Sequence, residues 1–199
     1  MKSYAYVEIE ERNRYFDEAI KIYQDAFQTP DFAVSPQRLE GFLLRKAAQP
    51  RLALLRDSEV VAMAVYASFK EGAVIWYLAV KREKRGKGLG SLMVRRLIDA
   101  LNSGTGDFLY AEYEDSLIPF WASNGFKVIP VRYYQPPLSN RWVRINLGAT
   151  PLHYRKTLSG KQVLSFVERI YADAYRVDYL GSPYFEGLRA DCENLTLRF

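Results

Sequence analysis

Apolar and polar residues follow two periods along this chain, and the two periods predict strands and helices in a definite order. Segments rich in β-branched and aromatic residues, or alternating with a period of two, are typical of strands. Segments that repeat apolar residues every three to four positions are typical of amphipathic helices. The predicted strands are residues 3–9, 51–56, 60–69, 73–80, 108–114, 126–134 and 141–147, and the predicted helices between them are 15–27, 36–47, 89–101 and 116–123.

Capping and turn residues support these helix boundaries. Pro30 ends the first helix, because the residue before a proline is disfavoured in the helical region. Ser35-Pro36 begins the second, with a side-chain cap followed by proline at the first helical position. Glycines between residues 102 and 106 end the third. The resulting order, β-α-α-β-β-β-α-β-α-β-β, predicts an α/β fold with a mixed, mostly antiparallel sheet flanked by helices.

The last fifty residues extend this pattern with helical segments. One helix is expected from Ser159-Gly160 to Ala174, and another begins at Ser182-Pro183 and carries Cys192 on its apolar side. Because no linker rich in glycine, serine or proline precedes them, we expect two parts: a domain at 1–149 and a helical C-terminal extension at 150–199 docked on it. The extension completes a substrate pocket, forms a homodimer interface, or caps the sheet.

Composition excludes several classes of protein. A chain of 199 residues with 49% hydrophobic and 26% charged residues is typical of a globular domain. No apolar run approaches 18 residues and no signal-peptide core follows Met1, so we expect a cytoplasmic protein without a membrane span. The single cysteine and the single histidine, His153, exclude an intrachain disulfide, a cysteine metal cluster and multi-histidine zinc motifs, so no metal is expected.

The net charge of +5 is unevenly distributed. No acidic residue occurs between Ser116 and Val167, a span that holds seven lysines and arginines, and a second basic cluster occupies residues 81–87. These clusters predict either a surface for anionic ligands or simply a solvated basic face. Nucleic acid is a weaker candidate, because the aromatic residues do not form an evident row for base stacking.

Arg85-Gly86-Lys87-Gly88-Leu89-Gly90 lies between the strand at 73–80 and the helix at 89–101. A glycine-rich turn between a strand and a helix makes an anion site, because backbone N–H groups and the helix dipole converge there. The spacing excludes the dinucleotide-binding fingerprint and the Walker loop. The Arg-x-x-Gly-x-Gly pattern resembles the acyl-CoA pyrophosphate loop of the GNAT superfamily of N-acetyltransferases. The family's aromatic-aromatic-x-x-x-Gly-Phe motif is similar to residues 120–126, and the order of elements is similar over residues 3–148.

The resemblance implies an acyl-CoA cosubstrate and a set of residues to hold it. The backbone at Leu78, Ala79 and Val80 would pair with the pantetheine arm. The pyrophosphate would be bound by the loop and the first residues of the helix. The residues implied there are Arg85, Gly86, Lys87, Gly88, Leu89, Gly90 and Ser91.

Catalysis needs a base for the amine and a proton for the leaving thiolate. Glu112 and Glu114 are two residues apart on one predicted strand, so they share a face, and either is a candidate base. The alternative is a strand-end carboxylate in water or in an ion pair with the basic face. Trp121 occupies the position where many family members carry a tyrosine, and indole cannot protonate a thiolate. Tyr134, with Tyr133 and Tyr113 as further candidates, would then be the acid, unless solvent serves.

The resemblance therefore implies an acyl-CoA-dependent N-acyltransferase, with acetyl-CoA as the default donor and a longer acyl-CoA as an option. The acceptor would be a primary amine of a small molecule or peptide, attacking directly in a ternary complex without an acyl-enzyme. Cys192 is flanked by Asp191 and Glu193, which do not favour a thiolate, so it is expected to be a buried hydrophobe. The alternatives are a non-catalytic acyl-CoA-binding sensor or scaffold and, from a third class, a nucleic-acid-binding protein.

Overall fold

The computed structural model describes residues 4–28, 33–45, 50–102, 104, 106–138 and 141–199. It divides into two compact units, one made of residues 1–68 and 75–103 and the other of residues 69–74 and 104–199. The strand pairs within each unit are antiparallel, and helices flank them. The expected α/β class is therefore confirmed.

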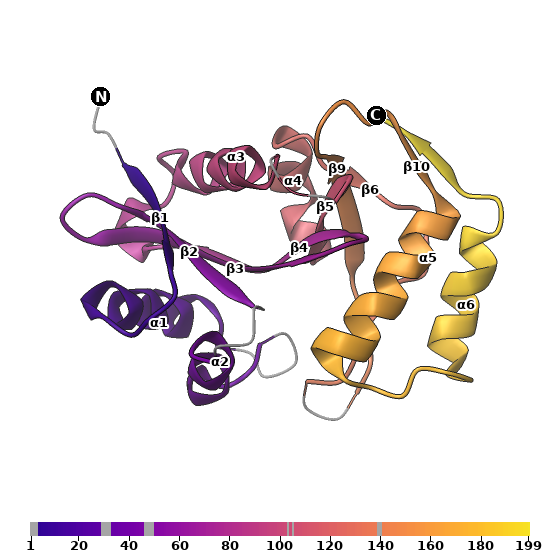
Figure 1. Ribbon diagram of the computed structural model, residues 1–199, viewed down its shortest axis with the longest axis horizontal. Helices are drawn as coiled ribbons and strands as arrows, with labels where there is room; N and C mark the ends of the chain where they lie inside the picture. Colours follow the sequence, from indigo (N-terminus) through magenta and orange to yellow (C-terminus); the bar gives the residue numbers. More distant parts are fainter. Residues whose placement is uncertain (1–3, 29–32, 46–49, 103, 105, 139–140) are drawn as a thin grey trace. The chain divides into compact units, whose positions relative to one another are not determined.

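The first unit contains four neighbouring strands in the order β1-β2-β3-β4. Their bounds are β1 (Ala5–Ile9), β2 (Arg51–Arg56), β3 (Val60–Phe69) and β4 (Gly72–Val80). Figure 1 shows α1 (Arg14–Ala26) and α2 (Pro36–Leu43) on one side of these strands and α3 (Leu89–Leu101) on the other. The three helices and four strands follow the predicted order.

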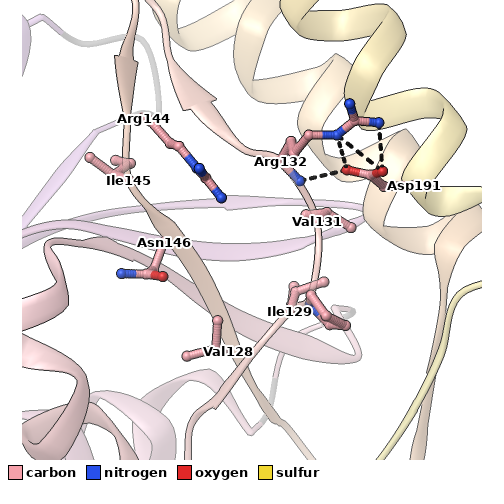
Figure 2. A pocket seen from close by; sticks show the side chains of 9 residues that line it. Val128, Ile129, Val131, Arg132, Arg144, Ile145, Asn146 and Asp191 are labelled. Carbon is pink, nitrogen blue, oxygen red and sulfur yellow. Dashed lines mark hydrogen bonds and ion pairs between the residues drawn. The ribbon is translucent and has the colours of Figure 1, made fainter.

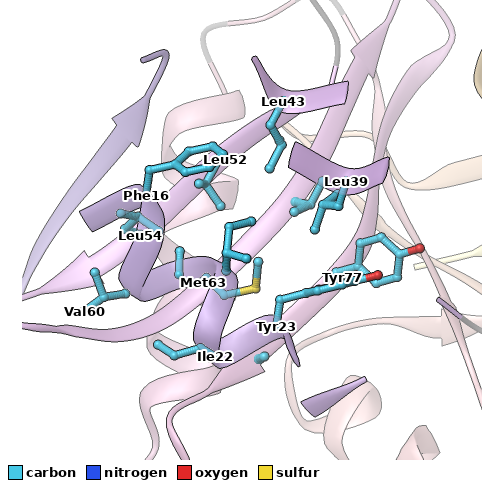
Figure 3. Packing of buried hydrophobic residues seen from close by; sticks show 14 of the residues in the cluster. Phe16, Ile22, Tyr23, Leu39, Leu43, Leu52, Leu54, Val60, Met63 and Tyr77 are labelled. Atoms are coloured by element: carbon cyan, nitrogen blue, oxygen red, sulfur yellow. The ribbon is translucent and has the colours of Figure 1, made fainter. Parts of the chain in front are cut away.

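The apolar faces of α1 and α2 build the core of this unit. Phe16 and Tyr23 of α1 and Leu39 of α2 are at most 1% exposed, and Figure 3 shows them packed over β2, β3 and β4. Side chains cap the starts of both helices; the Ser35 cap was predicted and the Asn13 cap was not. The Asn13 side chain accepts hydrogen bonds from the first turn of α1, and Ser35 Oγ accepts one from the backbone of α2. Pro30 and Ala47, which the sequence pattern predicts at helix ends, lie outside the described residues.

The second unit is built on strands in the order β5-β9-β6. These are β5 (Phe108–Tyr113), β9 (Asn146–Pro151) and β6 (Lys127–Val128). Figure 1 shows α4 (Ile118–Ser123) on one side of them and α5 (Gly160–Arg169) with α6 (Pro183–Cys192) on the other. Two small sheets complete the unit: β7 (Tyr134–Gln135) with β8 (Val143–Arg144), and β10 (Thr157–Ser159) with β11 (Thr196–Arg198).

Alternation along β5 sends its side chains to both helical layers. Tyr113 stacks on Trp121 of α4, with ring centroids 5.4 Å apart, and Tyr110 stacks on Phe166 of α5 at 3.7 Å. Glu112 has the same parity as Tyr110 and therefore lies on the α5 side.

Two predicted strands are wrong in extent. Only Lys127–Val128 of the predicted 126–134 strand is paired with β9, and residues 129–133 form tight turns in which the N–H groups of Val131 and Tyr133 bond to the carbonyls two residues earlier. Pro130 has no N–H to offer a ladder, which helps to explain the interruption. The predicted 141–147 strand is divided between β8 and β9, with a break at Ile145.

The C-terminal residues also differ from the prediction. Ser159 and Gln162 form a capping box at the start of α5, but the α-helix ends at Arg169 and continues as a π-helical turn, η3 (Ile170–Tyr175), where the sequence predicted a helix to Ala174. Strands β10 and β11 were not predicted, because three-residue strands carry too little periodicity to detect. Residue 149, the expected end of the first domain, falls within β9.

Candidate functional site

The glycine-rich segment adopts the backbone geometry of an anion-binding turn. After β4, a 3-10 turn, η1 (Arg82–Lys84), leads into Gly86 and Gly88, whose φ angles are +73° and +75°. These are left-handed conformations that glycine adopts without the steric cost of a Cβ. An added Cβ at either position would meet nothing within 4 Å, so the space beside the turn is open.

Gly88 is also the N-cap of α3, and no side chain caps this helix. The first turn of an α-helix has backbone N–H groups without intrahelical acceptors, and its dipole places partial positive charge at the same end. Leu89, Gly90 and Ser91 supply this turn. The arrangement can accept a phosphate on backbone donors.

The charges around the turn fall into two groups. Lys81 and Lys84 form ion pairs with Glu59 at 2.6 and 3.1 Å. Arg85 Nε instead donates to the Val80 carbonyl at 3.0 Å, and Lys87 Nζ donates to the Glu83 carbonyl at 3.3 Å. Both side chains are exposed and bonded to neutral groups, so their charges remain available to an anion.

The three strand residues expected to face pantetheine are the last three of β4. Leu78 and Val80 are partly buried and Ala79 is buried, as alternation in a strand predicts. The Val80 carbonyl already accepts the Arg85 bond. This hydrogen bond joins the strand end to the glycine turn.

Glu112 on β5 lies among tyrosines of the second unit. One carboxylate oxygen accepts a hydrogen bond from the Tyr133 hydroxyl, and the other accepts one from the Tyr175 hydroxyl at 2.5 Å. Burial raises the pKa of Glu112, whereas the two hydroxyl bonds lower it, and the net shift is upward. A partly buried carboxylate with a raised pKa is a stronger base than an exposed one, which suits it to take a proton.

An aromatic cluster surrounds these hydroxyl groups. Tyr171 lies at its centre, donates a hydrogen bond to the Tyr134 carbonyl, and has the Tyr133 ring 6.0 Å and the Trp142 ring 5.6 Å from its own. Tyr171 comes from η3, so the C-terminal extension supplies the middle of the cluster. No sequence signal joins residues 112, 133 and 175, because their contact depends on the tertiary fold.

The other two catalytic candidates lie in different surroundings. Glu114 follows the end of β5 and is exposed, and its carbonyl accepts the Leu117 N–H at the start of η2 (Asp115–Leu117). Tyr134 is in β7 with its ring 4.7 Å from that of Tyr184, centroid to centroid. The structure thus brings Glu112 together with Tyr133, and it does not bring Glu114 or the Tyr134 ring into that bonded group.

Trp121 is a core residue of α4. It is 4% exposed and packs between Tyr113 and Phe126, and its indole N–H has no acceptor among the described residues. A Cβ added to Gly148 would lie only 2.2 Å from the Tyr113 hydroxyl, so this hydroxyl packs directly against the Gly148 backbone. Burial raises the pKa of Tyr113 to about 12. Tyr113 is therefore a poorer proton donor than an ordinary tyrosine.

A separate pocket of about 390 Å³ opens at the edge of the second unit. Arg132 forms its fixed wall, because its guanidinium and its backbone N–H bond to Asp191 at 2.7–3.2 Å (Figure 2). Figure 2 also shows the Arg144 side chain extending toward this wall. The lining residues are Val128, Ile129, Pro130, Val131, Arg132, Arg144, Ile145, Asn146 and Asp191. With Arg132 neutralised, Arg144 gives the pocket its positive charge.

The remaining candidates are outside these groups. Cys192 is 4% exposed, and burial raises the pKa of its thiol to about 11, which agrees with a buried hydrophobe. His153 is exposed with φ +59°. Among the described residues, no three histidine, cysteine, aspartate or glutamate side chains are grouped to hold a metal. In the same part of the chain, no helix is both long and apolar enough to cross a membrane.

Comparison with solved structures identifies proteins of similar fold. A putative GNAT-family acetyltransferase from Bacteroides thetaiotaomicron is 16% identical, with a TM-score of 0.68 over 83% of this chain and 94% of that one. The ribosomal-protein-S18-alanine N-acetyltransferase from Escherichia coli is 18% identical, with a TM-score of 0.58 over 76% and 96%. A phosphinothricin acetyltransferase from Sinorhizobium meliloti in complex with AcCoA is 14% identical, with a TM-score of 0.57 over 74% and 88%.

A comparison with curated proteins gave no significant match. The sequence profile of the Acetyltransferase (GNAT) family matches residues 13–126, which is more than half of the chain and includes both the glycine turn and Glu112. The chain therefore belongs to the GNAT acetyltransferase family.

Proposed function

We propose that this protein transfers an acyl group, by default acetyl, from an acyl-CoA to a primary amine of a small molecule or peptide. The observation that carries the proposal is the geometry of the glycine turn. Two left-handed glycines lead directly into the uncapped N-terminus of α3, beside the exposed Arg85 and Lys87. This combination suits a pyrophosphate, which needs several backbone donors and a local positive charge.

In this proposal the donor is held by the residues implied by the family resemblance. The backbone of Gly86 to Gly90 and the Ser91 hydroxyl bind the pyrophosphate, and Arg85 adds charge. Backbone groups of Leu78, Ala79 and Val80 pair with the pantetheine arm. The exposed position of the turn and its open space on the Cβ side are consistent with an approaching phosphate.

Glu112 is the proposed base. It takes a proton from the ammonium form of the acceptor, and the nitrogen lone pair then attacks the thioester carbon. The C–S bond breaks, and CoA leaves as a thiolate that is protonated. Direct attack fits the buried, raised-pKa Cys192, which is unsuited to form an acyl-enzyme. Glu114 is a weaker candidate because it is exposed, and the hydroxyls of Tyr133 and Tyr175 bond to Glu112 instead.

The source of the proton for the thiolate is a choice between Tyr134 and solvent. Trp121 is buried in the core, and its indole N–H is too weakly acidic to protonate a thiolate. Tyr113 is enclosed and has a raised pKa. Tyr134 is partly buried, and its ring lies 4.7 Å from that of Tyr184, centroid to centroid. A thiolate needs little protonation near neutral pH, so a Tyr134→Phe variant is expected to keep most of its turnover if solvent serves.

The structural relatives are compatible with more than one kind of acceptor. One name specifies an alanine of a ribosomal protein, and another specifies phosphinothricin. For this chain, both a peptide amine and a small-molecule amine therefore remain in the proposal.

A second candidate function is a non-catalytic acyl-CoA sensor, which Trp121 favours because it replaces a tyrosine. Steady-state release of free CoA thiol from acetyl-CoA, measured with a panel of amino acids, polyamines, small aromatic amines and peptide N-termini, separates the two. Amine-dependent multiple turnover supports the enzyme. Saturable acetyl-CoA binding without turnover across the panel supports the sensor.

A further inference from the structure

The C-terminal extension reaches Glu112 through an unusual helical turn. After Arg169 the chain leaves α-helical geometry and forms η3, a π-helical turn that ends at Tyr175. Such turns are rare and frequently occur at functional sites, because they redirect side chains by one extra residue per turn. In η3 the redirected side chains include Tyr171 and Tyr175, which lie in the aromatic cluster.

Ion pairs and a backbone bond fix this turn in place. Arg169 bonds to Asp173 at 2.7 Å, within the turn, and to Glu71 at 3.3 Å. The Val177 N–H closes the end by bonding to the Tyr171 carbonyl at 3.1 Å. The Tyr171 hydroxyl then bonds to the Tyr134 carbonyl, which ties η3 to β7. The helical turn that carries Tyr175 is therefore held by several contacts.

The result is a carboxylate whose two oxygens are each held by a different phenol. Tyr133 donates to Oε1 and Tyr175 donates to Oε2 at 2.5 Å. We propose that Tyr175 is a positioning residue for the Glu112 base, so that the C-terminal extension forms part of the acyl-transfer site. This inference rests on the proposed function, in which Glu112 takes the proton of the amine.

The two phenols have two effects on the Glu112 carboxylate. They fix the rotation of the carboxylate, and they stabilise its ionised form by hydrogen bonding. A carboxylate has about four acceptor positions, so two bonds leave others for an amine or a water. The titratable groups that face Glu112 are Tyr133, Tyr171 and Tyr175; across the sheet, its partner on β9 is the apolar Leu147.

The test is Tyr175→Phe, which keeps the ring and removes the hydroxyl. Removing a donor to the ionised form makes that form less stable, so the Glu112 pKa is expected to rise. With a responsive amine, kcat should fall about tenfold, and the acid limb of the pH profile should move to higher pH. KM for acetyl-CoA should not change. Carboxyl-¹³C NMR titration of Glu112 measures the same upward shift without any turnover.

Tyr184→Phe is the matched control. Tyr184 belongs to the same extension and packs against Trp142 and Tyr134, but the hydroxyl bonds to Glu112 come from Tyr133 and Tyr175. It should leave the titration and the pH profile unchanged. Tyr133→Phe removes the other hydroxyl bond, so it should move the titration in the same direction as Tyr175→Phe, and it provides a second route if the Tyr175 variant folds poorly.

The outcomes are distinguishable. If both phenylalanine variants titrate like the wild type, Tyr175 does not position Glu112, and the inference is overturned even if the wild type is an active acyltransferase. If the titration shifts but the wild type transfers no acyl group, the hydrogen bond from Tyr175 to Glu112 is supported. The role of Tyr175 in catalysis is then refuted together with the proposed function. A shifted titration with a reduced kcat supports both.

Discussion

Gly88 combines an unusual backbone conformation with a position at the proposed phosphate site. It has a left-handed backbone with φ +75°, and it stands at the N-cap of α3 where a phosphate would approach. Its missing side chain leaves open space, since a Cβ there meets nothing within 4 Å. A substitution at this position can therefore affect a ligand without disturbing neighbouring side chains.

We predict that Gly88→Asp abolishes measurable acetyl-CoA binding. The carboxylate would lie beside the helix N-terminus and repel the pyrophosphate, while aspartate tolerates left-handed geometry better than most residues. Gly181→Asp is the matched control, because Gly181 has φ +77° and equally open surroundings. Calorimetric titration checks both variants. Retained affinity in Gly88→Asp would remove the glycine turn from the donor site.

Substitution of Glu112 tests whether this residue is the base. We predict that Glu112→Gln lowers kcat about a hundredfold, because the amide cannot take a proton, while acetyl-CoA affinity stays unchanged. In the wild type, kcat/KM should fall as the pH drops through the Glu112 pKa, because only the ionised form is a base. The raised pKa places this limb above the ordinary range of glutamate. Wild-type turnover in Glu112→Gln would exclude this residue as the base.

Single residues were predicted with uneven success. The glycine turn followed from local spacing, and the buried state of Cys192 followed from its place on an apolar helix face. The environment of Glu112 did not follow, because the Tyr175 hydroxyl comes from 63 residues away in the chain. Glu112 and Glu114 have equivalent positions in the sequence pattern, and only the end of β5 at Tyr113 separates their surroundings.

At the scale of elements, α5 and α6 meet through a contact that only glycine permits. A Cβ on Gly160, the first residue of α5, would lie 1.8 Å from the Cys192 carbonyl oxygen at the end of α6. The obstructing atoms belong to the backbone, so rotation of a side chain cannot relieve the overlap. The bond from the Gly160 N–H to the Leu195 carbonyl, 2.9 Å long, keeps the two segments close.

We predict that Gly160→Ala lowers the free energy of unfolding by about 2 kcal/mol or more, because the two helices must separate. In a chain of this size that corresponds to a fall in Tm of about 4–8 °C. Gly41→Ala is the control: Gly41 is exposed within α2 and a Cβ there meets nothing, so the change should be neutral or slightly stabilising. Differential scanning calorimetry measures both, and equal Tm values would contradict the close contact.

Predictability of elements followed their length and periodicity. The helices at 14–26 and 89–101 and the strands at 51–56 and 60–69 have long apolar faces, which fixed their type and nearly their ends. Residues 126–134 are apolar enough to predict a strand, yet Pro130 and the turns around it end the ladder after Val128. The π-helical turn η3 was predicted as α-helix, because the apolar spacing does not distinguish the two helices there.

At the scale of the whole molecule, ion pairs with acidic residues elsewhere in the chain neutralise part of the two basic clusters. Arg132 and Arg155, both in the span without acidic residues, bond to Asp191 and Asp107 on either side of that span. Lys81 and Lys84 are likewise paired with Glu59. These ion pairs reduce the positive potential of the clusters, which weakens the case for a nucleic-acid surface and leaves Arg85 and Lys87 beside the glycine turn.

The donor residues and the proposed base belong to different compact units. The glycine turn is in the first and Glu112 is in the second, together with the extension that supplies Tyr175. In the proposal, the residues that bind the donor come from the first unit and the base comes from the second. The donor can accordingly be tested before any acceptor is identified.

Calorimetric titration of acetyl-CoA into the full-length protein is the most direct test, because it requires no knowledge of the amine. We predict one acetyl-CoA bound per chain, with a Kd between about 1 μM and 1 mM, the range of common substrate affinities. The absence of saturable binding at millimolar acetyl-CoA and longer acyl-CoA would contradict the central claim, that the glycine turn binds an acyl-CoA.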